Sequence, residues 1–238
     1  MGKNILIIGA SGDIGIAIAK ELAIDGYQLL LHYHENRAPI DRLNREIDNE
    51  CIISVIQANL ATDTGVEKLI EKLIYPVDAI VFASGTAHYG LFQDLTRNTI
   101  DDMLTLHVKS PLLITKHVLP QMIQKRAGKI VFITSIWGSV GASHEVIYST
   151  VKGAQNSFVK SLAKEVATCG ISVNAVSPGF IETKMNRHLL DEERSAVISE
   201  IPMNRSGTPE EVAHIVQFLL NEKSSYVQGE IIQVTGGW

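Results

Sequence analysis

The chain has 238 residues, of which 45% are hydrophobic and 20% are charged, and this fits one sizeable α/β domain with a full core. The formal net charge of -5 does not suggest a nucleic-acid-binding surface, and the eight histidines could offset it only in part. No apolar segment reaches the length of a membrane span, and the opening run at residues 5–8 is too short for a signal peptide. The two cysteines lie far apart, so we expect reduced thiols in a cytoplasmic protein without nucleic-acid or membrane partners.

The first half of the chain alternates predicted strands with predicted helices. Short apolar runs predict buried parallel strands at residues 4–8, 28–33, 52–57 and 79–83. Helical spacing predicts helices at residues 16–25, 39–49 and 62–73, the last with Thr62 or Asp63 as its N-cap. This alternation is typical of a parallel sheet covered by helices.

A glycine-rich turn, Gly9-Ala10-Ser11-Gly12-Asp13-Ile14-Gly15, joins the first strand to the first helix. Glycines allow a tight turn and bring backbone amides against a pyrophosphate at the helix N-terminus, where the helix dipole favours negative charge. Such a turn is weak evidence by itself, because turns need glycine for conformational reasons alone.

The second half begins with a long helical tract at residues 96–122, followed by a strand at 130–133. A loop of small residues leads to a helical pattern that contains Tyr148 and Lys152, and strands are predicted at 171–177 and 230–234. Residues 185–202 mix polar and apolar side chains, which favours a mobile lid. The last helix, at 209–220, opens with Thr208 as its cap and Pro209 in its first turn.

Three side chains near the fifth strand suggest chemistry. Ser135 follows the carboxyl end of that strand, where open α/β sheets bind ligands. Tyr148 and Lys152 stand one helical turn apart, and a nearby ammonium lowers the pKa of a phenol from about 10. A Tyr and a Lys at this spacing are common by chance, so the case depends on the combination with Ser135 and the glycine turn.

That combination resembles the short-chain dehydrogenase/reductase family, whose signature is a Ser, Tyr-x-x-x-Lys and an N-terminal glycine turn. The resemblance runs from residue 4 to residue 237. It implies an α/β, doubly wound Rossmann-type three-layer sandwich with a seven-stranded parallel sheet, as a single domain over 1–238 with a substrate lid near 179–202. It also implies reduction of a ketone to an alcohol with NADP(H).

The resemblance assigns four catalytic residues. Ser135 polarises the ketone oxygen, Tyr148 donates the proton, and Lys152 lowers the pKa of Tyr148 and holds the nicotinamide ribose. His107 stands where the family commonly has an Asn that holds a water in the proton relay. An imidazole can donate and accept hydrogen bonds, so we predict the same role, with a structural histidine as the alternative.

The dinucleotide contacts are also assigned by resemblance. Asp13 replaces the middle glycine of the family's turn, with Gly12 one position earlier, so a carboxylate stands near the expected phosphate unless Asp13 turns outward and caps the helix. Of the family's Asn-Asn-Ala-Gly turn only Gly85 remains. The full set is Gly9, Ser11, Gly12, Asp13, Ile14, Gly15, Tyr33, His34, Arg37, Asn59 and Leu60 at the adenine, Ser84, Gly85, Tyr148, Lys152, Pro178, Gly179, Ile181 at the carboxamide, and Thr183 at a phosphate.

The end of the second strand bears on the choice of cofactor. In the family the residue at the position of Tyr33 usually decides, because an acidic side chain accepts the ribose 2′-hydroxyl but repels a 2′-phosphate. Tyr33 is not acidic, and Arg37 and His34 are available for a phosphate, whereas Glu35 fits the general rule for NAD. We favour NADP(H) and leave NAD(H) open. The alternative for this segment is a solvated strand end.

The substrate is less defined. Residues 130–135 and 201–211 are most similar to 3-oxoacyl-(acyl-carrier-protein) reductases, but Trp137 would crowd an acyl entrance. Residues 107–111 and 135–138 with Trp238 are similar to reductases of a 5-aminopentanone group on elongation factor P, and Glu145 would suit an amine. Alternatively, Trp137 packs only the loop and Glu145 is solvated. A binding protein that kept the fold and lost the reaction, a dinucleotide-binding regulatory protein, is the alternative of another class.

Two further sequence patterns do not indicate a function. Ser149 and Lys152 match the spacing of penicillin-binding proteins, but the partner motifs are missing. His32 and His34 have no third ligand at a plausible spacing, so no metal is predicted.

The resemblance implies a homotetramer through the helix of Tyr148 and the C-terminal strand, with Phe158, Leu162 and Trp238 as candidate contacts that could equally be core.

Overall fold

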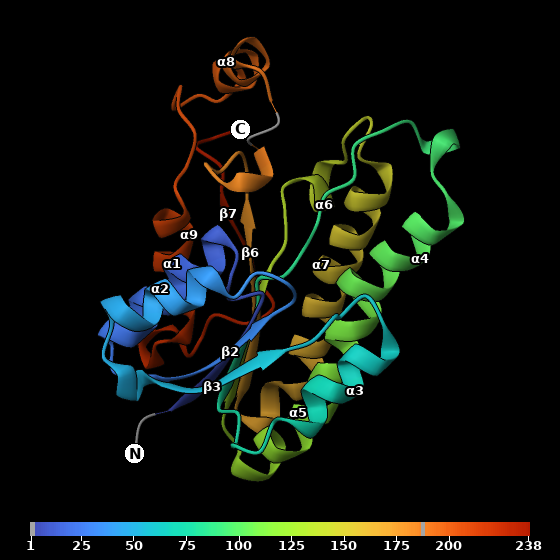
Figure 1. Ribbon diagram of the computed structural model, residues 1–238. Helices are drawn as coiled ribbons and strands as arrows, with labels where there is room; N and C mark the ends of the chain where they lie inside the picture. Colours follow the sequence, from blue (N-terminus) through green and yellow to red (C-terminus); the bar gives the residue numbers. More distant parts are fainter. Residues whose placement is uncertain (1–2, 187–188) are drawn as a thin grey trace.

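Seven parallel strands form one sheet in the computed structural model, which describes residues 3–186 and 189–238 (Figure 1). The spatial order is β3-β2-β1-β4-β5-β6-β7, so the direction of winding reverses between β1 and β4. This confirms the predicted doubly wound Rossmann-type fold. The strands are β1 Asn4–Ile8, β2 Gln28–Tyr33, β3 Ile52–Gln57, β4 Ala79–Phe82, β5 Gly128–Ile133, β6 Ile171–Pro178 and β7 Ile231–Val234.

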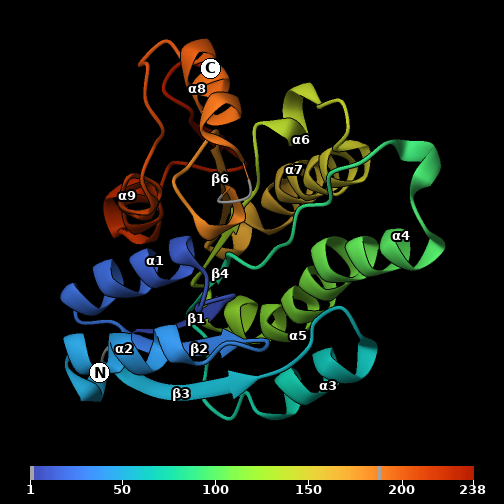
Figure 2. The ribbon, with the colours of Figure 1, turned by 45° about the horizontal axis from the view of Figure 1, so that its top comes forward.

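Helices cover both faces of the sheet and give three layers (Figure 2). One face carries α1 (Asp13–Ile24), α2 (Ala38–Glu46) and α9 (Pro209–Leu220), and α1 packs closely on α9. The other carries α3 (Asp63–Glu71), α4 (Arg97–Leu104), α5 (Ser110–Lys125) and α7 (Val146–Val166). None of the described helices is long and apolar enough to cross a membrane.

The first strand shows why its sequence is a continuous apolar run. Ile5 and Ile7 pack into the core beneath α1 and α9, whereas Leu6 and Ile8 pack into the core on the other face. Successive side chains of a strand point to opposite faces, so a strand buried on both faces has no polar position.

The helix boundaries differ from the prediction, and two predicted helices end early: α2 at Glu46 and α3 at Glu71. Helix α1 begins at Asp13, three residues before the predicted start. The tract predicted as one helix at 96–122 is α4, a π-helical segment at Thr105–Lys109 and α5. The loop after Ser135 contains a short helix, α6 (Trp137–Val140). The predicted lid contains a 3-10 turn, η5 (Lys184–Asn186), and α8 (Asp191–Glu200), while residues 187 and 188 of that segment lie outside the described residues.

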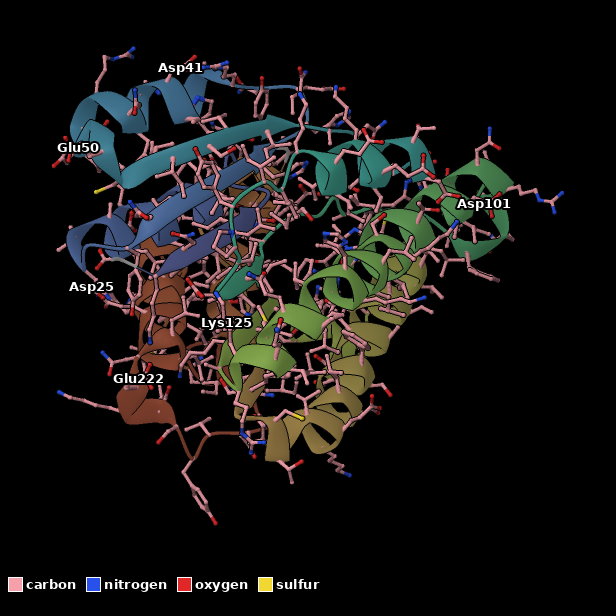
Figure 3. All side chains as sticks on the ribbon, turned by 90° about the horizontal axis from the view of Figure 1, so that it is seen from below. Asp25, Asp41, Glu50, Asp101, Lys125 and Glu222 are labelled. Carbon is pink, nitrogen blue, oxygen red and sulfur yellow. The ribbon has the colours of Figure 1, made fainter. Side chains whose placement is uncertain are left out.

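The amino edge of the sheet is where helices end. Figure 3 shows this side, with Asp25 at the end of α1, Lys125 as the last residue of α5 and Glu222 just after α9. The Lys125 ammonium lies 2.8 Å from the carboxylate of Asp78, which precedes β4. Ligands of doubly wound sheets bind at the opposite, carboxyl edge, and that edge holds the predicted site residues.

Candidate active site

The structure brings Ser135, Tyr148 and Lys152 together at the carboxyl edge of β5. Because α7 begins at Val146, Tyr148 and Lys152 lie on its first two turns. The hydroxyls of Ser135 and Tyr148 are hydrogen-bonded to each other, and the Ser135 oxygen also accepts from the Trp137 amide at 3.2 Å. Ser135 is buried, with 8% of its surface exposed, so this hydroxyl pair is held out of bulk water.

Burial shifts the pKa values of Tyr148 and Lys152. Burial raises the pKa of Tyr148 to about 12, against the hydrogen bond from Ser135 that lowers it, and the Glu145 charge raises it further. Lys152 is 3% exposed, and burial lowers its pKa to about 7. Its Nζ donates to the Ile133 carbonyl at 2.9 Å and lies 5.6 Å from the centre of the Tyr148 ring. The expected lowering of the Tyr148 pKa by Lys152 is not seen here, and the phenol keeps its proton at neutral pH.

His107 lies behind this pair, on the π-helical segment. Its side chain is 1% exposed, and its ring meets the Tyr148 ring edge-on at 6.0 Å between centroids. Its Nε2 lies 3.0 Å from the Thr86 carbonyl and 3.3 Å from the Thr86 amide, which donates to it, and Nδ1 has no hydrogen-bond partner among the described residues. Burial first, and the Lys152 charge second, lower the pKa of His107 to about 3, so the ring is neutral, and its tautomer decides whether Nδ1 donates or accepts.

The same histidine explains why a glycine remains at position 85. A Cβ on Gly85 would lie 2.8 Å from Cε1 of His107, which is closer than van der Waals contact allows. The backbone of His107 is fixed separately, because the buried Gln155 amide donates to its carbonyl at 2.7 Å. The sequence analysis did not single out Gln155.

The glycine turn has the shape of an anion cradle. Gly9 has φ +83°, and a Cβ there would lie 2.5 Å from the Cα of Ser84, at the end of β4. A Cβ on Gly15 would lie 2.3 Å from the Gly9 carbonyl. These contacts press the turn against β4 and direct the first amides of α1 to the carboxyl edge, so the turn fits a dinucleotide phosphate. Ser11 and Ile14 lie half-buried in the same turn, and Gly12 is the N-cap of α1.

His32 supports this turn from below, a role that the sequence analysis missed. It is 2% exposed, its Nδ1 accepts from the Gly9 amide at 3.1 Å, and its Nε2 donates to the Ala58 carbonyl at 3.0 Å. Since an amide can only donate and a carbonyl can only accept, these two bonds fix the tautomer. Burial lowers the pKa of His32 to about 4. The alternative of a solvated strand end is therefore wrong for His32, whose position after Leu31 in a buried strand was the available signal.

Asp13 does not cap its helix. The N-cap of α1 is Gly12, which has no side chain, and the carboxylate of Asp13, the first helical residue, accepts from the Lys184 backbone amide at 2.6 Å. The Lys184 ammonium lies 3.7 Å from the other carboxylate oxygen. Capping was the outcome expected if Asp13 turned outward, and the structure replaces it with a contact to the predicted lid.

The residues predicted for the 2′-phosphate lie at the end of β2. Tyr33 is buried and hydrogen-bonds the Arg37 side chain, which is exposed and pairs with Asp41 at 3.0 Å. His34 is exposed, with its Nε2 3.8 Å from the Glu35 carboxylate. Exposed basic and acidic side chains therefore lie close together at the end of β2.

The residues predicted to contact adenine and the nicotinamide are held by packing and by hydrogen bonds to the backbone. Asn59 accepts from the Ala61 amide at 3.0 Å, and Leu60 is buried in the core, so its side chain packs inward. On the other side, the Ile181 carbonyl accepts from the Asn186 side chain at 2.8 Å. The remaining predicted residues lie beside these: Pro178 accepts from the Ile136 amide, Gly179 donates to the Val234 carbonyl, and Thr183 lines a cavity of about 380 Å³ together with Asp13 and Lys184.

Aromatic side chains pack against each other on the loops that flank Ser135 and Tyr148. Trp137 packs edge-on against the terminal Trp238, with 5.0 Å between ring centroids. Tyr89 stacks on His144 at 5.2 Å, which ties the loop after β4 to the loop before α7. Glu145 is half-buried, and its charge raises the pKa of Tyr148. The alternative that Glu145 is solvated is therefore wrong.

A phosphate cradle at the winding reversal, with a serine, a phenol and an ammonium at the neighbouring strand end, defines a dinucleotide-dependent oxidoreductase. A family model described as Enoyl-(Acyl carrier protein) reductase matches residues 9–238. The chain belongs to the short-chain dehydrogenase/reductase family, whose members act on CH–OH and C=O groups with a nicotinamide dinucleotide.

Several known proteins are similar over their whole length. The Bacillus subtilis oxidoreductase YmfI is 45% identical over 240 residues, covering 100% of this chain and 99% of that protein. The 3-oxoacyl-[acyl-carrier-protein] reductases FabG of Staphylococcus epidermidis and Aquifex aeolicus are 33% and 36% identical over 241 residues, covering 100% and 99% of this chain and 99% and 97% of those proteins. The structure of YwfH, described as an NADPH dependent reductase involved in bacilysin biosynthesis, superposes with a TM-score of 0.91 at 22% identity, covering 100% of this chain and 98% of that one, which shows the shared fold.

Proposed function

We propose that the protein reduces a ketone to an alcohol with NADP(H), and that its substrate is a 3-oxoacyl thioester carried on acyl carrier protein. The observation that carries the reaction is the buried Ser135–Tyr148 hydroxyl pair above Lys152, beside the glycine turn. The two FabG relatives, at 33% and 36% identity, support the substrate class.

The chain's own residues orient the ketone and move the proton. A bound dihydronicotinamide supplies the hydride. Ser135 donates a hydrogen bond to the carbonyl oxygen, and Tyr148, which keeps its proton at neutral pH, gives that proton to the oxygen as it gains charge. Lys152 orients the ribose and returns a proton to the phenol. We propose that Nδ1 of His107 holds a water on this return path.

The preference for NADP(H) rests on the end of β2. Tyr33 is not acidic, and the Arg37 guanidinium beside its hydroxyl is available to a 2′-phosphate. An arginine matches the geometry of a phosphate better than other side chains do. The exposed His34 adds a second donor.

A second substrate is favoured by a specific observation at the entrance. Glu145 places a half-buried carboxylate close enough to raise the pKa of Tyr148, and such a group would bind the ammonium of an aminoketone. Trp137 and Trp238 narrow the acyl entrance at the same time. These features support reduction of a 5-aminopentanone group on elongation factor P.

The two substrates are separated by one assay of NADPH oxidation. Acetoacetyl thioester and aminopentanone-bearing elongation factor P are compared on the wild type and on Glu145→Gln. A carrier-linked oxoacyl substrate is reduced equally by both proteins, whereas an aminoketone is reduced by the wild type and about tenfold more slowly by the variant. If neither substrate leads to oxidation of NADPH, both proposals are contradicted. The same assay with NADH in place of NADPH tests the cofactor preference.

We further propose a homotetramer, as the resemblance implies. Leu112 and Ile123 are exposed on α5, and an apolar groove of about 300 Å³ lies between α5 and α7. Of the contacts expected from sequence, Leu162 is buried in the core, Phe158 packs on that core, and Trp238 packs on the loop that follows Ser135. Light scattering is expected to give a tetramer for the wild type and smaller species for Ile123→Glu, and a monomeric wild type would refute the assembly.

A further inference from the structure

The carboxylate of Asp13 links two segments that lie 171 residues apart in the sequence. One oxygen accepts from the Lys184 amide at 2.6 Å, and the other lies 3.7 Å from the Lys184 ammonium. The side chain of Asp13 is 27% exposed, so the contact is partly shielded from water. A hydrogen bond from an amide to a carboxylate is about twice as strong as one between neutral groups.

Neither the turn nor α1 requires this carboxylate. The N-cap of α1 is Gly12 and not Asp13, and the shape of the turn is set by Gly9 and Gly15. A negative charge at the N-terminus of α1 also opposes the binding of a phosphate there. The use of Asp at this position therefore needs another reason, and its bond to Lys184 is the one that the structure offers.

The contact continues into the lid, defined here as residues 179–202. Lys184 is the first residue of η5, and Glu182, two residues earlier, accepts from Arg194 of α8 at 3.0 Å. The residue between them, Thr183, lines the cavity of about 380 Å³ that also contains Asp13. The N-terminus of α1, the predicted phosphate contact and α8 are thus joined in series, and Figure 1 shows α8 standing above the carboxyl edge of the sheet.

We propose that Asp13 is a positioning residue, whose carboxylate holds the first part of the lid on the N-terminus of α1. The lid is then placed by the protein itself before a ketone arrives, and Thr183 is kept at the turn. The Lys184 ammonium offsets the charge of Asp13 near the phosphate site. This inference rests on the proposed function for the meaning of the lid, but the contact itself is tested without the reaction.

Hydrogen exchange of residues 181–186, measured by mass spectrometry without cofactor or ketone, tests the contact. Asp13→Ala removes the acceptor, and loss of one such bond is expected to speed exchange of the Lys184 amide about tenfold. Asp13→Asn keeps an acceptor and removes the charge, so its exchange stays within about threefold of the wild type. Lys184→Ala keeps the backbone amide and is the matched control, with wild-type protection expected.

Kinetics supply the second readout. Asp13→Ala is expected to raise KM for the ketone several-fold with little change in kcat, and Asp13→Asn restores the KM. Unchanged exchange at Lys184 in a folded Asp13→Ala protein overturns the inference, and Asp13→Gly tests the same point if the alanine variant does not fold. Absent ketone reduction with altered exchange would refute the proposed function and leave the contact established.

Discussion

A buried histidine lies next to each half of the active site. The two histidines differ in whether both of their ring nitrogens have hydrogen-bond partners. Under the dinucleotide half, both ring nitrogens of His32 are bonded, one to the Gly9 amide and one to the Ala58 carbonyl. Under the catalytic half, His107 bonds Thr86 through Nε2, while its Nδ1 has no partner within the described part of the chain. Burial lowers the pKa of both rings, to about 4 and about 3.

The difference teaches how to separate a positioning histidine from a candidate catalytic one. Burial and a lowered pKa are shared, so they do not distinguish the two roles. A ring with both nitrogens bonded fixes backbone geometry and cannot exchange a proton without breaking a bond. A buried ring nitrogen left without a partner beside Tyr148 lowers the stability of the fold, and such groups persist where they serve function. The variants below test this distinction.

The largest effect is expected in the catalytic half at Tyr148. Tyr148→Phe removes the proton donor and keeps the ring, so kcat for ketone reduction should fall about a thousandfold, within the range for general acid catalysis. NADPH affinity, measured by fluorescence, should stay within a few-fold. A Phe variant that retains full activity would refute the assignment of the proton donor.

His107→Ala should lower turnover by roughly tenfold to a hundredfold, at or below the lower end of the range for general acid–base catalysis. NADPH affinity should be kept, because the glycine turn does not touch this ring. His107→Asn, which restores an amide able to hold a water, should recover part of the rate. Equal turnover in the alanine variant and the wild type would make His107 merely structural.

In the dinucleotide half, Arg37→Ala tests the cofactor preference. Loss of a charged contact to the 2′-phosphate should weaken NADPH binding about tenfold and leave NADH binding unchanged. Titration of both cofactors by fluorescence measures the ratio. Asp41→Asn frees the guanidinium without removing it and is the control that should retain the preference for NADPH. Equal losses for both cofactors would contradict a 2′-phosphate site at this position.

The smallest effect at neutral pH concerns His32 and appears on acidification. Its pKa is about 4 in the folded chain and about 6.5 unfolded, so its contribution is complete above about pH 6.5 and is lost as the pH falls to 4. His32→Gln should flatten the fall in unfolding free energy over this window by up to about 1.4 kcal/mol per pH unit, which is one proton. Urea unfolding at several pH values measures the slope. Identical slopes for His32→Gln and the wild type would contradict the burial of a neutral ring.

Most of the fold followed from periodicity, whereas the catalytic residues were assigned by resemblance to the family. The strands at residues 4–8, 28–33 and 52–57 match β1, β2 and β3, and the helix at 209–220 matches α9 with its Thr208 cap, because apolar runs and capping residues are local signals. The break of the tract at 96–122 into α4, a π-helical segment and α5 was not visible, because the widened turn places His107 through contacts with distant residues.

The chain by itself determined the alternation of strands and helices, the glycine turn and the spacing of Tyr148 and Lys152, since each depends on neighbours within a few residues. Only the tertiary structure decided which partners the side chains of Asp13, His32 and His107 have. Their partners lie between 21 and 171 residues away, and a hydrogen bond or a buried dielectric is made by whatever the fold brings near. The pKa of the phenol shows the same division, since the sequence supplied a nearby cation that would lower this pKa, whereas burial of the phenol in the fold raises it.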